Sequence, residues 1–203
     1  LFAFVFAAVS LVRFQGTQDR ISLILGSGFL LSGATLTASS VLFFQGMRES
    51  TLWFVWAPAA WWISRLLLAL LFVAALVVEH FLPRSRHPRL EIAGALFGVL
   101  SLTYLITAAL RKLPPEASHH PNAIIPNPLH LLPALIFLVA LVGYNRRKYL
   151  MDSAYDHSIF GAVWLNLAAQ LAACQSEKLL DGPFVFAQAM NVASYTILLG
   201  GAL

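Results

Sequence analysis

The sequence predicts an all-α polytopic membrane protein, a bundle of seven transmembrane helices of which the first is truncated. Hydrophobic residues make up 59% of the 203 residues and charged residues only 11%, and the mean hydropathy is +0.77. A soluble domain carries about 25% charged residues, so this chain has too few polar groups to cover a water-facing surface. Apolar runs that reach or approach the length of a membrane span recur seven times. These observations exclude a soluble globular fold and a disordered chain.

The predicted spans follow from the lengths of these runs. An α-helix needs about 20 mainly apolar residues to cross the hydrocarbon core of a bilayer. In order, the spans are residues 1–12, 21–44, 52–82, 90–110, 129–144, 159–174 and 184–203. The polar segments between them are short, which favours antiparallel neighbours and leaves no length for a soluble domain. We therefore expect residues 1–203 to form a single transmembrane domain.

Both ends of the sequence are apolar. The first run has only 12 residues, and residues 200–203 still lie within apolar sequence. Half a span in lipid would leave backbone groups without hydrogen bonds. We therefore expect the domain to be a fragment of a longer polypeptide.

Four of the five tryptophans mark the beginning of the third run: Trp53, Trp56, Trp61 and Trp62. Tryptophan is enriched at membrane–water interfaces because the indole has an apolar body and one N–H that needs a polar partner. The first third of this run is therefore expected at the outer interface. The crossing itself is expected to run from about Trp61 to Leu82.

The thirteen Lys and Arg residues predict the orientation of the bundle. Eight fall on one side, four on the other, and Arg65 lies inside the third span. The side with eight holds Arg13, Arg20, Arg84, Arg86, Arg89, Arg146, Arg147 and Lys148. By the positive-inside rule, the N-terminus then lies outside and the C-terminus in the cytoplasm.

Arg65 is the only basic residue within a predicted span, and two interpretations of it are open. Arginine costs about 2.5–3.5 kcal/mol at the bilayer centre on insertion scales, so the guanidinium must face protein, water or headgroups. It either extends to the outer headgroups or forms a fixed positive charge in an outward-facing pocket, where it holds an anion or a polar side chain. Stacking on Trp61 or Trp62 fits both interpretations.

Polar residues follow one face of the sixth span and one face of the seventh. In each, they recur at intervals of three or four residues, which places them on one side of a helix. Amides need partners in hydrocarbon, so both faces are expected to point into the bundle. Interhelical hydrogen bonds and a polar ligand pocket between the two helices are the two alternatives. The ligand hypothesis assigns the site to Trp61, Arg65, Asn166, Gln170, Gln188, Asn191 and Tyr195.

Hydroxyl residues and glycines in the second and fourth spans are given structural roles. Hydroxyls in membrane helices often donate to the carbonyl four residues earlier. We expect this of Thr35, Thr37, Ser39, Ser40, Thr103 and Thr107. Gly94 and Gly98 form a GxxxG pattern, which permits close helix approach, and we expect it to pack against another helix of this chain.

Metal binding and catalysis find little support in the sequence. The candidate zinc or copper ligands are His119, His120 and His130, with Glu116 beside them, but their spacing matches no standard site. No predicted span holds a buried Asp or Glu, and a proton relay or a cation-coupled transport site would require one. Motifs of metalloproteases, hydrolases and phosphate-binding loops are lacking as well. We therefore predict no metal, no cofactor and no catalytic residue here, and we expect no nucleic-acid partner.

Three segments resemble the third class of MASE domains, the membrane-associated sensors at the N-terminus of bacterial histidine kinases and diguanylate cyclases. They are GSGFLLSGATLTASSVLFFQGM (26–47), WWISRLLLALLFVAAL (61–76) and FAQAMNVASYTILLGGAL (186–203). Trp61 and Arg65 fill the W-x3-R signature of that family. The family's Asp and His in the second span, and its His and Lys in the last helix, are replaced by Thr37, Ser40, Gln188 and Asn191.

The resemblance implies a sensory input domain in the bacterial cytoplasmic membrane. Such a domain detects a small ligand, a lipid or a membrane state. It passes the signal to a cytoplasmic output domain that follows in the same chain, a histidine kinase or diguanylate cyclase, within a homodimer. The segment itself is then not an enzyme. Two alternatives stay open, a structural or assembly subunit of a membrane complex and a small transporter, although the sequence shows no repeat between halves.

Overall fold

The computed structural model describes residues 1–46, 53–82, 85, 87–110, 125–151, 153–177 and 181–203. Within them, seven α-helices account for most of the chain, and the all-helical prediction is confirmed. The helices are α1 (Phe2–Thr17), α2 (Arg20–Gly46), α3 (Trp53–Phe81), α4 (Pro88–Leu110), α5 (Leu131–Met151), α6 (Ala154–Cys174) and α7 (Gly182–Ala202). A short 3-10 helix, η1 (Pro128–His130), directly precedes α5. Each predicted span corresponds to one helix.

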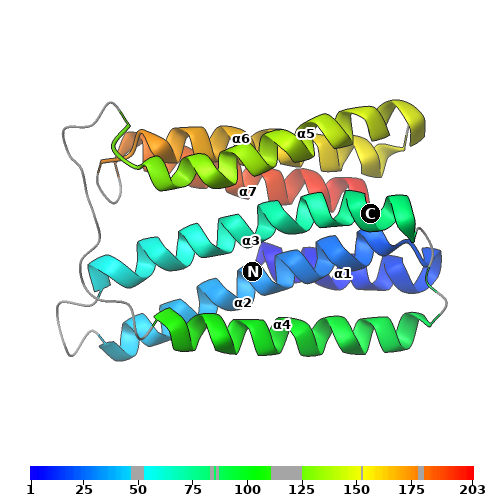
Figure 1. Ribbon diagram of the computed structural model, residues 1–203, viewed down its shortest axis with the longest axis horizontal. Coiled ribbons are helices and arrows are strands. Elements are labelled where there is room, and N and C mark those ends of the chain that lie inside the picture. The colour runs from blue at the N-terminus through cyan, green and yellow to red at the C-terminus, as the bar shows by residue number, and fades with distance from the viewer. Residues whose placement is uncertain (47–52, 83–84, 86, 111–124, 152, 178–180) are drawn as a thin grey trace.

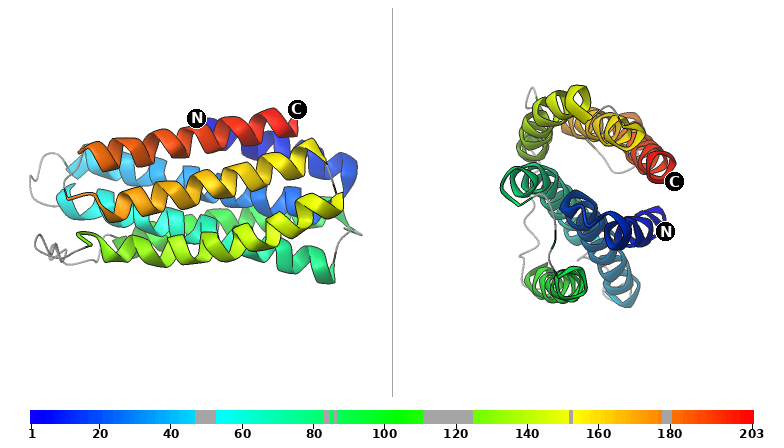
Figure 2. Two further views of the ribbon diagram at one scale, coloured as in Figure 1. Left: turned by 90° about the horizontal axis from the view of Figure 1, so that it is seen from above. Right: turned by 90° about the vertical axis from the view of Figure 1, so that its right-hand side faces the viewer.

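The helices run up and down in alternation and form two layers (Figures 1 and 2). One layer holds α5, α6 and α7, the other holds α3, α2 and α1, and α4 lies outside the second layer against α2. The layers meet where α3 packs on α5 and where α1 packs on α7. Six helices therefore form a closed ring, with α4 outside it.

One end of the bundle gathers the basic residues. The beginnings of α2, α4 and α6 and the C-terminus lie together at this end, on the right in Figure 1. Arg20, Arg89, Arg146 and Arg147 belong to its helix ends, and we call it the basic end. These four residues, which are predicted to lie on one side of the membrane, thus lie at one end of the molecule.

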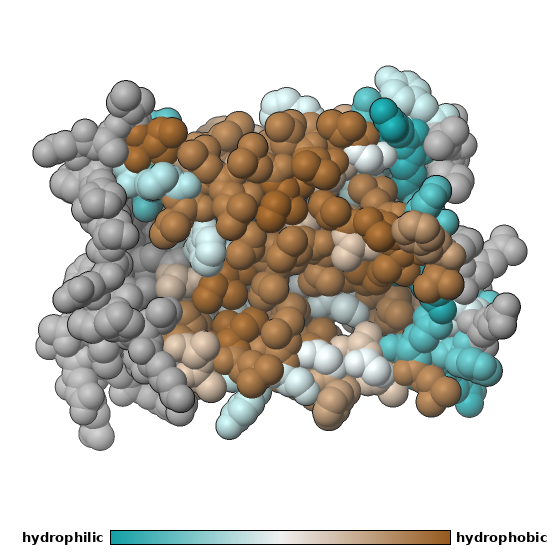
Figure 3. All heavy atoms as spheres, in the orientation of Figure 1, coloured by the Kyte–Doolittle hydropathy of each residue, from teal (hydrophilic) through white to brown (hydrophobic). Residues whose placement is uncertain are grey.

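Six helices, α2 to α7, contain spans of 20 to 23 residues that are apolar enough to cross a membrane, and α1 is a shorter apolar helix. In the space-filling view, hydrophobic side chains cover the middle of the visible face, and hydrophilic residues gather at the basic end (Figure 3). An apolar band of this kind is what the hydrocarbon core of a bilayer requires. The fold is consistent with a membrane-embedded helical bundle.

An aromatic layer joins four helices of the ring, α1, α2, α3 and α5. Phe29 on α2 makes edge-on contacts with Phe6 on α1, at 4.6 Å between ring centroids, and with Phe72 on α3, at 6.0 Å. Phe72 in turn contacts Phe137 and Tyr144, both on α5. All five rings are fully buried. Because edge-on aromatic pairs are favourable beyond their buried area, this layer fixes the spacing between the two halves of the ring.

The first turn of α6 corrects a prediction about buried acids. The hydroxyl of Ser153 accepts a hydrogen bond from the backbone N–H of Asp156 at 3.1 Å, and this N-cap starts the helix five residues before the predicted span. Asp156 is therefore buried inside the first turn. The prediction that the spans hold no acid is wrong at this position, where Arg147 Nε donates to the Asp156 carboxylate at 2.6 Å.

The hydroxyl and glycine predictions have mixed outcomes. Four hydroxyls donate to the carbonyl four residues earlier, as expected: Thr37, Ser39, Ser40 and Thr107. The hydroxyls of Thr35 and Thr103 are instead buried without a partner in the described part of the chain. The expectation for Gly94 and Gly98 is wrong, because a Cβ at either position would meet no atom within 4 Å. Both glycines lie on the exposed side of α4, which packs on α2 with a different face.

Candidate functional site

Arg65 lies in the interior of the bundle, with only 7% of its surface exposed. Its Nη1 donates a hydrogen bond to the hydroxyl of Tyr195 on α7 at 3.0 Å. The guanidinium carbon lies 5.8 Å from the centroid of the Tyr195 ring, within the range of a cation–π interaction. This burial favours the interior interpretation of Arg65 over extension to the headgroups.

The neighbour of Arg65 on α3 fixes this region to α2. The Ser64 and Ser32 hydroxyls are 2.6 Å apart, and both residues are buried. The Tyr195 ring also contacts Phe29 edge-on at 5.2 Å. Arg65 is thus bonded to α7 directly, and its neighbour Ser64 and its partner Tyr195 both contact α2.

The amides predicted to face inward are buried, with the exception of Gln188, which is half-buried. Asn166, Gln170 and Asn191 are at most 4% exposed. Gln170 Oε1 lies 3.1 Å from Nδ1 of His130 in η1. The two helices therefore turn their polar faces toward the interior, as the periodicity predicts.

The packing of α6 on α7 places two of these amides at the same level. A Cβ at Gly201 would overlap Ser158, and a Cβ at Gly161 would touch Ile197 at 3.6 Å. α6 and α7 are antiparallel, so these two close contacts fix the register between them. In this register Asn166 lies level with residues next to Asn191. Tyr195 lies one turn away toward the basic end, and Gln170 lies one turn away in the other direction.

The amide oxygens at this level have no hydrogen-bond partners in the described part of the chain. Asn166 Nδ2 donates to the carbonyl of Ala162 at 2.8 Å, but Asn166 Oδ1 accepts nothing, and the same holds for Asn191 Oδ1. A buried carbonyl without a donor costs about 1–3 kcal/mol. Asn166 and Asn191 therefore bring two uncompensated carbonyl oxygens to this level of the bundle.

The electrostatics of Arg65 differ from those of Arg20 and Arg147, which are half-buried. Arg147 pairs with Glu79 and Asp156, and Arg20 pairs with Glu91 at 2.5 Å. Among the described residues, Arg65 has a hydroxyl and an aromatic ring as partners and makes no ion pair. The region therefore carries a positive charge that no carboxylate of the described chain neutralises.

We call this region the arginine cluster: Arg65, His130, Asn166, Gln170, Asn191 and Tyr195. Two aromatic contacts lie beside it, toward the end opposite the basic end. Trp61, one turn before Arg65, stacks at a tilt on Phe184 at 4.9 Å between ring centroids. Trp62 Nε1 donates to the carbonyl of Leu129 at 2.7 Å. Both tryptophans thus tie α3 to the beginnings of α7 and η1.

Sequence reasoning missed two members of this arrangement. The sequence predicts His130 only as a metal ligand, whereas its partner in the structure is Gln170. Phe184 is not predicted, because a phenylalanine at the start of an apolar helix gives no local signal of its contact. Of the predicted site residues, Trp61 lies beside the cluster, and Gln188 on α7 is half-buried.

The metal hypothesis falls partly on residues that the structure does not describe. Glu116, His119 and His120 lie outside the described residues. Within the described ranges, no group of three or more His, Cys, Asp or Glu side chains could hold a metal ion. His130 is instead part of the arginine cluster.

Comparison with known proteins gives no relative. The chain matches no protein-family model, and no curated protein and no solved structure gives a match. The resemblance to membrane-associated sensor domains therefore remains a prediction from three sequence segments.

Proposed function

We propose that the chain is a membrane-embedded sensory input domain that binds a small anionic ligand in the arginine cluster. The observation that carries the proposal is the buried Arg65, whose positive charge lacks a carboxylate partner in the described chain. Intramembrane charges are costly and mark binding sites or relays in many membrane proteins. A carboxylate or phosphate would accept hydrogen bonds from the guanidinium, and its other polar groups would donate to the amide oxygens.

The position of α7 supports coupling to an output. α7 contributes Tyr195 and Asn191 to the cluster and runs from there to Leu203 at the basic end (Figure 1). A ligand that binds two helix arrangements with different affinity shifts their populations by that difference. A shift of α7 would reach an output domain that continues from Leu203. The expected output domain is a histidine kinase or diguanylate cyclase in a homodimer.

The proposed orientation of the domain in the membrane follows from the position of the basic end. Arginines gather where α2, α4 and α6 begin and α7 ends, and the positive-inside rule assigns that end to the cytoplasm. The arginine cluster then lies nearer the outer surface, with Trp61 and Trp62 beside it. In this orientation the domain senses from the outside of a bacterial cytoplasmic membrane.

Ligand binding is tested on the full-length protein in lipid nanodiscs. The probes are small carboxylates, phosphates, amines and neutral compounds of matched size, and the readout is the thermal unfolding midpoint. We expect one class of anion to raise the midpoint of the wild type, an effect that Arg65→Met weakens about tenfold in apparent affinity, as the loss of one charged hydrogen bond predicts. Arg146→Met, at an exposed position of α5, is the matched control and should bind normally.

Signal transfer is tested separately with a cysteine at the end of α7. In a Cys174→Ala background, Leu203→Cys reports cross-linking between two copies of the full-length protein. We expect the anion found above to change the cross-linking rate. Binding without such a change would exclude the sensor and favour a transporter. Equal responses of wild type and Arg65→Met to every probe would favour a structural subunit, which needs no site.

A further inference from the structure

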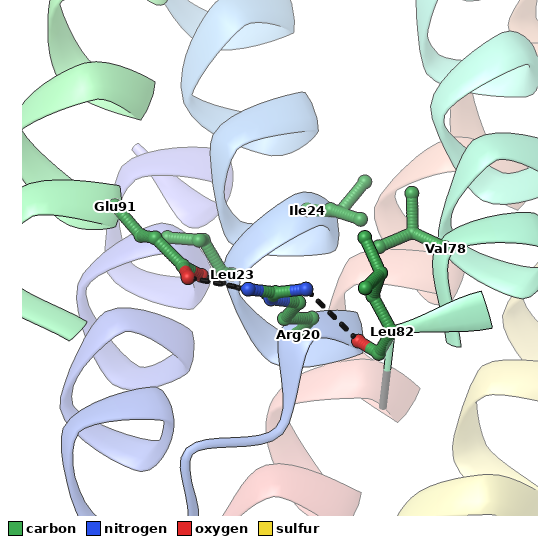
Figure 4. A pocket seen from close by; sticks show the side chains of 6 residues that line it. All are labelled: Arg20, Leu23, Ile24, Val78, Leu82 and Glu91. Atoms are coloured by element: carbon green, nitrogen blue, oxygen red, sulfur yellow. Dashed lines mark hydrogen bonds and ion pairs between the residues drawn. The ribbon is translucent and has the colours of Figure 1, made fainter. Parts of the chain in front are cut away.

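A groove of about 390 Å³ lies outside the arginine cluster, between α2, α3 and α4 at the basic end (Figure 4). We call it the α2–α4 groove. It is lined by Arg20, Leu23, Ile24, Val78, Leu82 and Glu91. Four of these side chains are aliphatic, and the two charged ones form an ion pair at its mouth.

The groove exists because α4 packs along α2 and makes few contacts with α3. Only 11% of the α4 span is buried inside the molecule. The described side chains therefore leave a wedge-shaped groove between α3 and α4. Its walls are Leu23 and Ile24 from α2 and Val78 from α3, so filling it with water would leave water molecules without polar partners.

The charges at the mouth are arranged to bind a phosphate. Arg20 Nε and Nη2 donate to the Glu91 carboxylate at 3.0 and 2.5 Å, and Nη1 donates to the carbonyl of Leu82 at 3.3 Å. A guanidinium carries five N–H groups, and two of those on Arg20 have no acceptor among the described residues. Guanidinium groups bind phosphate oxygens through two such N–H groups in parallel. The Glu91 carboxylate beside them suits an ammonium group.

The depth of these groups matches that of a phospholipid. Arg20 and Glu91 lie in the first turns of α2 and α4, and Leu82 directly follows α3, so the charges lie where membrane spans end. Ile24 and Val78 lie about one turn deeper along their helices. The charged groups lie at the end of the spans, and the aliphatic wall lies deeper in the membrane. A phospholipid has the same order, with a charged headgroup above an apolar acyl chain.

We propose that the α2–α4 groove binds one glycerophospholipid of the cytoplasmic leaflet, with its phosphate on Arg20 and an acyl chain against Ile24 and Val78. An amine-bearing headgroup places its ammonium at Glu91. The bound lipid fills the wedge between α3 and α4 and joins α4 to the rest of the bundle. The site is independent of the arginine cluster.

The experiment uses the purified protein in detergent and counts bound lipids by native mass spectrometry. The probe is dioleoylphosphatidylethanolamine, with dioleoylglycerol as the analogue without phosphate and glycerol 3-phosphate as the analogue without chains. We expect one phospholipid to be retained per chain. Both analogues are expected to bind at least about tenfold more weakly, because each lacks one of the two contacts. Equal binding of either analogue and the phospholipid would overturn the proposal.

Two variants separate the groove from general lipid adhesion. Ile24→Trp fills the groove and keeps the ion pair, and Val77→Trp places the same indole on the exposed side of α3. We expect Ile24→Trp to lose phospholipid retention about tenfold and Val77→Trp to retain it fully. Arg20→Gln should also weaken retention, through the phosphate. Unchanged retention in both Ile24→Trp and Arg20→Gln would place the lipid elsewhere.

Discussion

α3 carries a charged side chain in each half of the bundle, and the two are partnered differently. At the basic end, Glu79 pairs with Arg147, which also pairs with Asp156. Two turns from the fully buried Phe72 in the other direction, Arg65 contacts the hydroxyl and ring of Tyr195. Glu79, Phe72 and Arg65 are seven residues apart in turn and therefore lie near one face of the helix.

The comparison distinguishes charges that stabilise the fold in ion pairs from charges that remain available to bind a ligand. At the basic end, removal of one charge leaves its partner without compensation in a half-buried site. In the arginine cluster, the guanidinium and the amide oxygens of Asn166 and Asn191 already lack full compensation from the described chain. Substitutions should therefore destabilise the first region and alter binding in the second.

The largest effect is expected from Arg147→Met, which leaves Glu79 and Asp156 without their shared cation. The loss of one partner of a buried ion pair costs about 3–5 kcal/mol. Unfolding in mixed detergent micelles with added SDS measures this free energy. Arg146→Met, one residue earlier and exposed, should change it by less than about 0.5 kcal/mol. A small effect of Arg147→Met would show that its carboxylate partners are solvated.

A smaller loss is expected where α7 meets the beginning of α6. A Cβ on Gly201 would overlap Ser158 and come within 3.2 Å of the Ala154 carbonyl oxygen, whereas Gly200 has open space. Gly201→Ala should destabilise by about 1–3 kcal/mol, as overpacking does. Gly200→Ala should be neutral or slightly stabilising, because alanine favours the helix. The same unfolding assay compares them, and equal effects would mean that the last turn of α7 moves freely.

The helices and the inward direction of the amide faces could be predicted because both depend on local patterns, the length of apolar runs and the helical period. The beginning of α6 could not be placed, because Ser153 caps the helix within a polar stretch that reads as a loop. The Tyr195 partner of Arg65 lies 130 residues away, and only the packing of the ring brings them together. Gly94 and Gly98 show that a GxxxG pattern permits close approach without specifying a neighbour.

At Asn191, a substitution is expected to raise the stability of the protein, whereas the substitutions above lower it. Its Oδ1 is buried without a donor in the described chain, so Asn191→Leu removes an uncompensated carbonyl. We expect the variant to be more stable than the wild type by up to about 1 kcal/mol and to bind the anion more weakly. Stability is measured by SDS unfolding and binding by the thermal shift in nanodiscs. A destabilised variant would indicate that the Asn191 side chain makes a stabilising hydrogen bond between helices.

The smallest effects are expected from the removal of two tyrosine hydroxyls, one in the half of the bundle at the basic end and one in the half with the arginine cluster. Tyr144→Phe removes the bond from the Tyr144 hydroxyl to the Phe72 carbonyl at 3.1 Å, and Tyr195→Phe removes the bond from Arg65. Hydrogen bonds between membrane helices average about 0.6 kcal/mol, so the two losses of stability should be similar. Only Tyr195→Phe should change anion binding, because it frees an N–H of Arg65. If both variants bind the anion as the wild type does, Tyr195 does not restrain the guanidinium. If Tyr144→Phe alone alters anion binding, the aromatic layer couples the basic end to the arginine cluster. The two halves of the bundle are then not independent.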